Sequence, residues 1–349
     1  MIDKQIFRIG NTSIYNRDAL TLYNSWDSPQ VIISDGGYGV SGFKGDPHYP
    51  SDLISWYEPH IKDWSQKATP GTILWFWNTE IGWALVHPVL DKYGWDYACC
   101  NIWNKGIQHI AGNCNLPILK NFPVVTEVCI QYVKRPAFIV ADAELTLKEW
   151  LRYEWERTGM PFSKTNEACG VINAATRKYF TKDHLWYAPP PEVFEKLVLY
   201  ANLYGNNNGK PYFSIDGKKP LSNTQYEKLF SQFHGKYGIT NVWDHPPIHN
   251  GERVKLSGSS RYAHLNQKPM KLIKMLIEVS SSQDEVIWEP FGGLCTIGLA
   301  AYLLNRKSFS AEINPDIFKI ALQRFERDSN GLFAESHTTI EQMTAYAGT

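Results

Sequence analysis

The stretch Val286-Ile287-Trp288-Glu289-Pro290-Phe291-Gly292-Gly293-Leu294-Cys295-Thr296 decides the fold of this chain. Its apolar start is typical of a buried strand, and its glycines predict a turn. Helix-forming residues follow over Thr296–Leu304, and a second apolar run, Ser308–Glu312, ends in an acid. Strand, Gly-rich turn, helix and strand in this order form a βαβ unit of the kind that holds adenosine-containing cofactors. We therefore expect an α/β fold with a cofactor site at this turn.

Two features of this unit suit such a ligand. Gly292 and Gly293 let the backbone approach the ligand, and Glu312 lies about 20 residues further on, where an acid accepts hydrogen bonds from ribose hydroxyls. The turn lacks the GxGxxG pattern, which disfavours a pyrophosphate-binding dehydrogenase. The alternative interpretation is a glycine turn that only packs a helix on a sheet.

The N-terminal part of the chain alternates strands and helices in the same way. The β-branched run Val31–Ile33 stops at Asp35-Gly36-Gly37-Tyr38, the position at which binding loops lie in α/β folds. We expect a Rossmann-like fold with a mostly parallel sheet and helices on both faces. The predicted strands are 31–33, 72–77, 97–103, 124–133, 285–288 and 308–312, and the predicted helices are 51–64, 81–93, 266–280, 296–304 and 315–327.

The middle of the chain has a different composition. From about Ala143, helices rich in charged and aromatic residues replace the alternation, and segments marked by Pro and Gly then run to about Asn250. We expect a mainly helical second domain inserted over residues 143–250, between two halves of the first domain at 1–142 and 251–349.

The amino-acid composition limits the classes of protein to which this chain can belong. The chain has 349 residues, 43% of them hydrophobic, with 35 basic and 35 acidic side chains, which excludes a disordered polyelectrolyte. Without net charge, a nucleic-acid partner must be held by a local patch. No apolar run approaches the roughly 18 residues of a membrane span, so we expect a cytoplasmic protein with no membrane partner. The spacing of the six cysteines predicts neither a disulfide nor a metal site.

Segments in both halves of the first domain resemble the β-class amino-DNA methyltransferases, which act on adenine N6 or cytosine N4. In that family a catalytic Asp/Ser-Pro-Pro-aromatic motif follows a strand early in the chain, and Asp35-Gly36-Gly37-Tyr38 stands in that place. The resemblance covers about 31–136 and 261–325 and leaves the middle domain uncovered. The other segments that carry it are Trp103-Asn104-Lys105 followed by Phe122 and Glu127, then Asn266-Gln267-Lys268-Pro269, Val286–Thr296 and Ser310–Asp316.

The resemblance implies a fold, a cofactor and a site. The two halves become a catalytic half and a cofactor-binding half, S-adenosylmethionine is the cofactor, S-adenosylhomocysteine is the product, and no metal is required. The carboxylate of Asp35 and the carbonyl of Gly36 would accept hydrogen bonds from the exocyclic amine of the target base, and Tyr38 would stack on a base flipped out of duplex DNA. The implied catalytic residues are Asp35, Gly36, Gly37 and Tyr38, and the implied cofactor-binding residues are Lys268, Glu289, Pro290, Phe291, Gly292, Gly293, Thr296 and Glu312.

The catalytic motif leaves alternatives open. An acid at its first position is usual for adenine-N6 enzymes, whereas serine is usual for cytosine-N4 enzymes, so Asp35 favours adenine. Gly36-Gly37 in place of Pro-Pro removes two fixed φ angles and leaves the acceptor carbonyl on a flexible loop unless packing restrains it. The alternatives are a cytosine-N4 methyltransferase on the same fold and a catalytically silent, sequence-specific DNA-binding relative.

The middle domain contains a segment that resembles a helix-turn-helix. Residues 163–180 read as a helix, a Gly-Val turn and a second helix with polar and basic residues. We expect this domain to be the target-recognition domain; the alternative is a plain pair of helices with a solvated basic face. The candidate DNA-binding residues here are Asn173, Thr176, Arg177 and Lys178.

A second basic cluster precedes and opens the helix predicted at 266–280. Arg253, Lys255 and Arg261 are its candidate DNA-binding residues, and Lys268, Lys271 and Lys274 extend it. We expect double-stranded DNA as the partner. The family resemblance adds a homodimer and a cognate restriction endonuclease as candidate partners.

Overall fold

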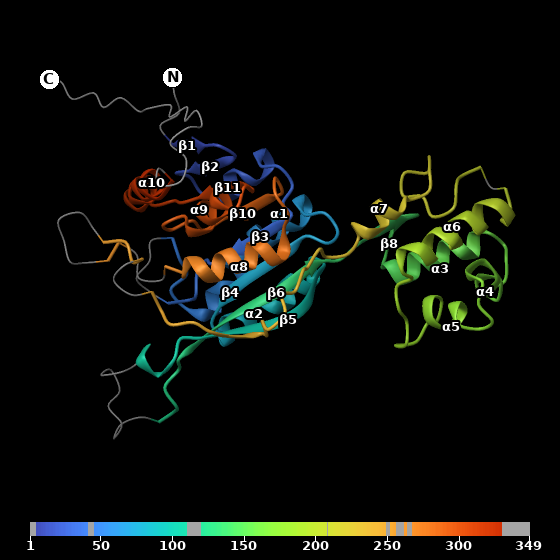
Figure 1. Cartoon of the computed structure of the whole chain (residues 1–349), viewed down its shortest axis with the longest axis horizontal. Coiled ribbons are helices and arrows are strands. Elements are labelled where there is room, and N and C mark those ends of the chain that lie inside the picture. Colours follow the sequence, from blue (N-terminus) through green and yellow to red (C-terminus); the bar gives the residue numbers. More distant parts are fainter. Residues whose placement is uncertain are drawn as a thin grey trace. The chain divides into compact units, whose positions relative to one another are not determined.

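The structure is a computed structural model that describes residues 5–40, 45–109, 120–207, 209–248, 252–255, 262–263 and 267–329. The chain divides into two compact units, each with its own hydrophobic core (Figure 1). The first unit comprises Met1–Lys134 and Gln232–Thr349, and the second is Arg135–Ser231. Two residues of the sequence predictions, Arg261 and Asn266, lie outside the described residues.

A single sheet forms the centre of the first unit. Within the described residues it has nine strands, in the order β1-β2-β11-β10-β3-β4-β6-β5-β9. The strands from β2 to β4 are mutually parallel, whereas β6 runs antiparallel to both β4 and β5. The predicted mostly parallel sheet is confirmed. Its strands are β1 (Ile6–Ile9), β2 (Thr12–Tyr15), β3 (Val31–Ser34), β4 (Ile73–Asn78), β5 (Trp95–Asn104), β6 (Thr126–Lys134), β9 (Val242–Asp244), β10 (Val286–Glu289) and β11 (Lys307–Ala311).

Helices cover both faces of this sheet. Apolar residues of α1 and α2 pack on one face, those of α8 and α9 pack on the other, and α10 packs against α9 and β2. The predicted strand and helix positions agree with these elements to within a few residues at their ends. The helices are α1 (Leu53–Lys67), α2 (Glu80–Lys92), α8 (Met270–Ser280), α9 (Thr296–Leu303) and α10 (Pro315–Ser329).

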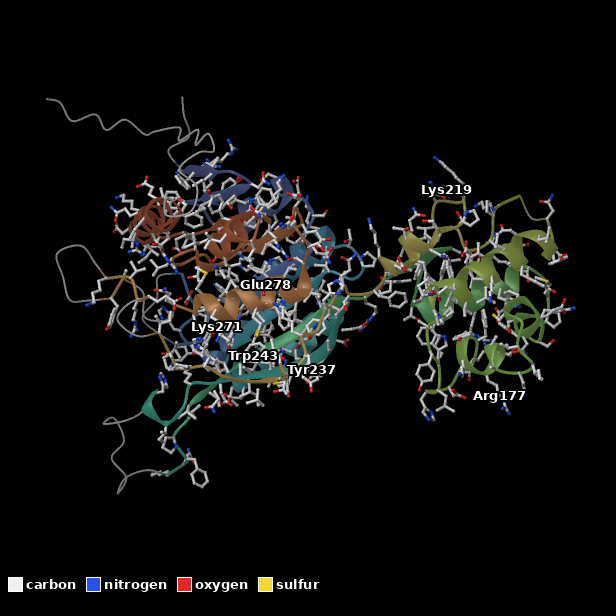
Figure 2. The ribbon with its side chains drawn as sticks, viewed as in Figure 1. Arg177, Lys219, Tyr237, Trp243, Lys271 and Glu278 are labelled. Carbon is white, nitrogen blue, oxygen red and sulfur yellow. The ribbon has the colours of Figure 1, made fainter. Side chains whose placement is uncertain are left out.

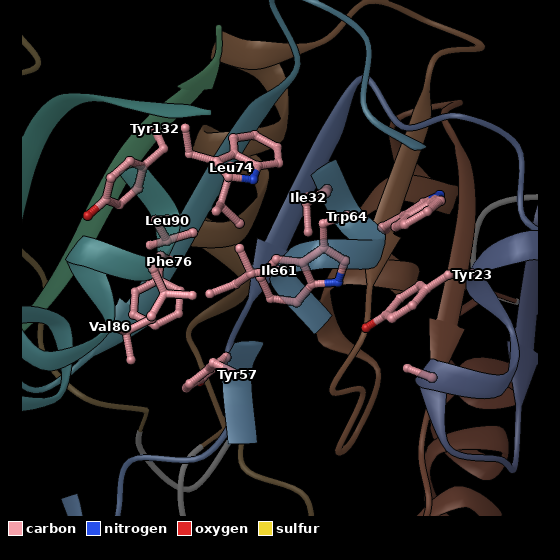
Figure 3. Close-up of a cluster of buried hydrophobic side chains, with 14 of the residues drawn as sticks. Tyr23, Ile32, Tyr57, Ile61, Trp64, Leu74, Phe76, Val86, Leu90 and Tyr132 are labelled. Atoms are coloured by element: carbon pink, nitrogen blue, oxygen red, sulfur yellow. The ribbon is translucent and has the colours of Figure 1, made fainter. Parts of the chain in front are cut away.

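Strand β4 shows why both faces need cover. All six of its residues are buried, and they alternate between the two cores. Leu74 and Phe76 join the core under α1 and α2, while Trp75 and Trp77 join the core under α8. Figure 3 shows Ile61 and Trp64 of α1 among the side chains of the first of these cores. A continuous apolar run therefore places β4 in the middle of the sheet.

The second unit is mainly helical, as predicted, and has a small hairpin of its own. Its core gathers residues such as Trp150, Trp155, Phe194 and Tyr226. Thr146 starts α3 with a capping box, because its hydroxyl accepts from Glu149 N while the Glu149 side chain accepts from Thr146 N. Its elements are β7 (Phe138–Val140), β8 (Ala143–Leu145), α3 (Leu147–Arg157), α4 (Lys164–Cys169), α5 (Ala175–Tyr179), α6 (Pro191–Tyr204) and α7 (Asn223–Glu227).

The predicted limits of the insertion, 143–250, differ from the observed unit at both ends. The hairpin β7-β8 belongs to the second unit, because Phe138 stacks on Trp150 of α3 at 4.2 Å between ring centroids. Strand β9 belongs to the first unit, because it pairs with β5 and buries Trp243 in the core under α8. The first unit therefore resumes at Gln232, ahead of the predicted residue 251.

The sequence predictions also missed the hairpin β1-β2 at the sheet edge. Its two strands have four residues each, which is too short for a periodic pattern to stand out.

In the described part of the chain, no helix is both long enough and apolar enough to span a lipid bilayer.

Candidate active site

A cavity of about 650 Å³ at the carboxyl ends of the parallel strands brings together two predicted motifs. Its lining includes Asp35, Gly36 and Tyr38 from the loop after β3. It also includes the loop after β10 and Glu312, the residue after β11. The residues from the loop after β10 are Pro290, Phe291, Gly292, Gly293, Leu294 and Thr296.

Asp35 is held by one of its two carboxylate oxygens. Its Oδ1 accepts from Lys268 Nζ at 2.7 Å and from the Tyr38 hydroxyl at 2.9 Å. Within the described residues no donor contacts Oδ2, and the side chain is 18% exposed. One oxygen of Asp35 is therefore fixed by the protein, and the other is free to accept a hydrogen bond from a ligand.

The two glycines after Asp35 lie on a restrained loop. The carbonyl of Gly37 accepts from the Tyr57 hydroxyl at 3.1 Å and from Asn78 Nδ2 at 3.0 Å. No described residue donates to the carbonyl of Gly36, which lines the cavity. Packing and hydrogen bonds thus supply the restraint that Pro-Pro would otherwise give.

Close packing explains why these two positions are glycine. A Cβ on Gly36 would lie 2.6 Å from the Phe291 ring and 2.8 Å from the Tyr57 hydroxyl, and a Cβ on Gly37 would lie 2.5 Å from Pro47. Neither glycine has a positive φ, so sterics and not backbone conformation exclude a larger residue. The space next to the loop is filled by Phe291, whose ring also stacks against Trp56 at 4.9 Å.

The Lys268 ammonium lies within a group of four charged side chains. Besides Asp35, it contacts the Tyr38 hydroxyl at 3.1 Å and Glu127 Oε2 at 3.3 Å. Glu127 Oε1 in turn pairs with Lys105. Burial alone would lower the pKa of Lys268, but Asp35 and Glu127 outweigh it and the pKa lies above its usual value. Lys268 was predicted to bind cofactor and to extend a surface cluster. Its side chain is 3% exposed, lines the cavity and pairs with Asp35.

Sequence reasoning assigned no role to Lys105, Glu127, Tyr57 or Asn78. Lys105 and Glu127 stand in a segment that resembles the family, which is the signal that could have found them. Tyr57 and Asn78 gave no signal, because a tyrosine in an amphipathic helix and an asparagine at a strand end read as structural residues.

Glu289 is buried and is held by three donors of the protein. Its carboxylate accepts from the backbone N–H groups of Ile297 and Gly298, at 3.0 and 2.8 Å, and from the Ser310 hydroxyl at 2.6 Å. Burial raises the pKa of Glu289 to about 7 against the effect of these donors. Glu289 therefore ties the start of α9 to β10 and β11.

The carboxylate of Glu312 binds the backbone of the Gly-rich loop. Its Oε2 accepts from Gly293 N at 2.7 Å, and its Oε1 accepts from Asn314 N at 2.6 Å. Burial raises the pKa of Glu312, while these two donors lower it. Each carboxylate oxygen keeps a further lone pair, so the group can still accept from a ligand in the cavity.

Arg324 of α10 holds the far end of the same loop. Its Nη1 donates to the hydroxyl of Thr296 at 2.7 Å and to the carbonyl of Leu294 at 3.2 Å. Burial lowers the pKa of Arg324. Thr296, predicted to bind cofactor, lines the cavity but has its hydroxyl engaged by Arg324.

Asp46 is a further acid in the cavity that the sequence did not suggest. Burial, with a contribution from the charge of Asp35, raises the pKa of Asp46 to about 6.

Among the described residues, no group of three His, Cys, Asp or Glu side chains has the arrangement of a metal site.

The predicted helix-turn-helix forms two short helices, α4 and α5, and α5 starts at Ala175. Asn166 caps α5 by accepting from Ala175 N at 3.0 Å. Arg177 lies on the outside of the second unit (Figure 2), and Asn173 and Lys178 are exposed as well. Thr176 differs, because its hydroxyl bonds to Thr165 and to the Phe162 carbonyl, at 2.8 and 2.9 Å.

The basic cluster of the first unit is partly described. Arg253 packs on the Tyr262 ring at 3.9 Å, and Lys255 is exposed and bridges to the backbone of Tyr262. Lys271, labelled in Figure 2, is also exposed.

Comparisons with known proteins bear on this site. The chain matches a family model described as DNA methylase (N6_N4_Mtase) over residues 23–323. The Type II methyltransferase M.ScaI of Streptomyces caespitosus is 30% identical over 192 residues, which cover 51% of this chain and 55% of that protein. The DNA adenine methyltransferase YhdJ of Escherichia coli is 35% identical over 86 residues, 25% of this chain and 27% of that protein. The chain thus spans about half or less of the length of these relatives.

A solved structure with a similar arrangement is the PvuII DNA methyltransferase, titled cytosine-N4-specific. It has a TM-score of 0.48 and 13% sequence identity, and the match covers 90% of this chain and 86% of that one.

Proposed function

The chain belongs to the DNA methylase family, and on that premise we propose that it transfers a methyl group from S-adenosylmethionine to the exocyclic N6 of adenine in duplex DNA. One observation carries the proposal: a single cavity is lined both by the Asp35–Tyr38 loop and by the Gly-rich loop with Glu312. A methyl donor at one loop and an acceptor amine at the other would then be adjacent.

The residues of the Gly-rich loop fit a nucleoside-type ligand. A Cβ on Gly292 would lie 2.9 Å from the carbonyl of Ala311, so the loop packs directly on β11 with no side chain between them. Glu312 would hold the ribose hydroxyls, and Pro290, Phe291 and Gly293 would line the rest of the ligand. The bound cofactor supplies an electrophilic methyl group on a sulfonium.

The Asp35 loop would prepare the acceptor. The exocyclic amine of a base is a poor nucleophile, because its lone pair is delocalised into the ring. Hydrogen bonds from its two N–H groups to Asp35 Oδ2 and to the Gly36 carbonyl would favour the pyramidal form, whose lone pair can attack the methyl group. Both acceptors are free of donors from the described residues, and Tyr38 would stack on the flipped base.

Two observations favour adenine as the acceptor. An acid stands at the first position of the catalytic motif, and one relative bears the name of a DNA adenine methyltransferase. Cytosine-N4 methylation would use the same acceptors and is therefore an outcome that the experiment must separate.

The test is mass spectrometry of nucleosides from mixed-sequence duplex DNA after incubation with the protein and S-adenosylmethionine, beside an Asp35→Ala control. We expect N6-methyladenine with the wild-type protein alone. N4-methylcytosine would keep the mechanism and correct the base. No methylated base across well-sampled target sequences would overturn the proposal in favour of a silent DNA-binding protein.

We assign target recognition to the second unit, with Asn173, Arg177 and Lys178 toward DNA, and include Arg253, Lys255 and Arg261 as phosphate contacts. A homodimer and a cognate restriction endonuclease complete the proposed partners. Arg177→Ala should relax sequence preference, with a loss of about 1–3 kcal/mol at one base position of the target. Methylation of a library of target variants measures this, and equal losses on all sequences would make Arg177 a phosphate contact.

A further inference from the structure

We propose that Lys105, Glu127 and Lys268 form a buried chain of alternating charges that positions the carboxylate of Asp35, and that Lys268 serves Asp35 and not the cofactor. The inference rests on the proposed methyl transfer. It assigns positioning roles to two residues, Lys105 and Glu127, for which the sequence predicted none.

The contacts of the Lys268 ammonium carry the first step. An ammonium has three N–H donors, and three acceptors surround this one: Asp35 Oδ1 at 2.7 Å, the Tyr38 hydroxyl at 3.1 Å and Glu127 Oε2 at 3.3 Å. The Tyr38 hydroxyl accepts from Lys268 and donates to Asp35. Two of these contacts are hydrogen bonds and the third is an ion pair, so the protein itself supplies partners for the charge of Lys268.

The charges balance along the chain. Asp35 and Glu127 are negative, and Lys268 and Lys105 are positive, so the group of four is neutral as a whole. Lys268 is 3% exposed, and Lys105, Glu127 and Asp35 are 12%, 17% and 18% exposed. Removing one member of a buried group of charges leaves an uncompensated charge, which is costly at this depth. Without the two lysines, the negative charge of Glu127 would repel that of Asp35. Lys268 balances one of these two negative charges, and Lys105 balances the other.

These contacts determine how the carboxylate of Asp35 is oriented toward the acceptor amine. Since Lys268 and Tyr38 both bind Oδ1, the carboxylate of Asp35 has a fixed orientation with Oδ2 free for the acceptor amine. Lys105 pairs with the outer oxygen of Glu127, which leaves Oε2 for Lys268. Each charge thus fixes the next one inward, from the residue after β5 through β6 and the segment before α8 to the loop after β3.

The test uses the whole 349-residue chain and single-turnover methylation, at saturating S-adenosylmethionine, of a DNA duplex that the wild-type chain methylates. Lys268→Met should lower the rate about 100-fold, the loss expected when a reacting group is misplaced by about 1 Å. Cofactor affinity by calorimetry should change less than about threefold, because the ammonium of Lys268 is paired with Asp35 and Glu127. Lys105→Met should lower the rate about tenfold, since it acts two contacts away from Asp35.

Glu127→Gln supplies a readout that a packing role would not move. Alone it should lower the rate a few-fold, because Lys268 loses a charged partner. In the Lys268→Met or Lys105→Met background it should raise the rate, because it removes a carboxylate that has lost its balance.

Matched controls are Lys319→Met and Glu58→Gln, two exposed ion-pair members in other parts of the first unit. Circular dichroism and thermal unfolding check that each variant is folded. If Lys268→Met does not fold, the comparison of Lys105→Met with the double variant Lys105→Met/Glu127→Gln still tests the inference. Weakened cofactor binding at an unchanged saturated rate, or multiplicative losses in the double variants, would overturn the inference while methylation by the wild type stands. If the wild-type protein does not methylate DNA, both the proposed function and this inference are wrong.

Discussion

The two loops that meet in the cavity are held in place in opposite ways. The Gly-rich loop after β10 is fixed mainly within its own βαβ unit, where Glu289 binds the start of α9 and Glu312 binds Gly293 N. Arg324 of α10 binds its far end. The Asp35–Tyr38 loop after β3 is fixed from a distance, by Lys268 and Glu127 on its charged side and by Tyr57 and Asn78 on its backbone.

This difference separates binding from chemistry. A loop held by backbone N–H groups and two nearby carboxylates presents a fixed surface to a ligand whatever happens elsewhere. A loop held by a chain of charges from the residue after β5, from β6 and from the segment before α8 depends on several distant parts of the first unit. We therefore expect mutations of the first loop to act on cofactor affinity and mutations of the second to act on rate.

The largest effect should come from Asp35 itself. Asp35→Asn and Asp35→Ala should lower the rate of methylation by about 10² to 10³, the cost of removing one preorganised polar group at the reacting atoms. Cofactor affinity should stay near that of the wild type. Single-turnover kinetics and calorimetry measure the two quantities, and equal losses in both would break the division between the loops.

Glu312→Ala should do the reverse. Loss of a charged acceptor weakens S-adenosylmethionine binding by about 1.5–3 kcal/mol, and the rate at saturating cofactor should fall far less. Because Glu312 also accepts from Gly293 N and Asn314 N, Glu312→Gln removes the charge and keeps one of these two backbone contacts. Unchanged affinity in calorimetry would remove Glu312 from the cofactor site.

Gly36→Ala tests how the catalytic loop is packed. The added Cβ would meet the Phe291 ring and the Tyr57 hydroxyl, so we expect a loss of about 1–3 kcal/mol in the free energy of unfolding, together with a lower rate. Phe291→Leu in the same chain should restore part of the rate. Gly235→Ala, at an exposed glycine without a positive φ, is the matched control. Chemical denaturation that finds no loss would show that the loop is free to move.

The smallest effect concerns Glu289 and pH. Burial raises the pKa of Glu289 from 4.5 to about 7, so the folded protein binds more protons than the unfolded chain between these values. Its contribution to stability is present below pH 4.5 and is lost as the pH rises through 7. Glu289→Gln does not titrate, so the difference in unfolding free energy between wild type and variant should narrow by about 1–2 kcal/mol from pH 5 to 8. Denaturation at both pH values measures it, and a constant difference would contradict the assignment.

The sequence anticipated much of the fold, for identifiable reasons. Long buried runs such as Ile73–Asn78 and amphipathic stretches such as Leu53–Lys67 carry their own pattern, and both were predicted to within a few residues. The hairpin β1-β2 and strand β9 were missed, because they are short and also contain polar or charged residues, unlike the equally short apolar run of β3. The same weakness misplaced the insertion, since β9 returns the chain to the first sheet before the composition changes back.

What the sequence alone determined is the local chemistry: a Gly-rich turn between strand and helix, an acid at the end of the next strand, and an Asp-Gly-Gly-Tyr loop after a buried strand. These follow from neighbouring residues. The tertiary structure alone decided that Lys268 faces Asp35 at 2.7 Å, across 233 residues of sequence, and that Tyr57 and Asn78 share the carbonyl of Gly37. The reason is physical: burying a charge or a carbonyl requires a partner, and that partner is set by which strands lie side by side.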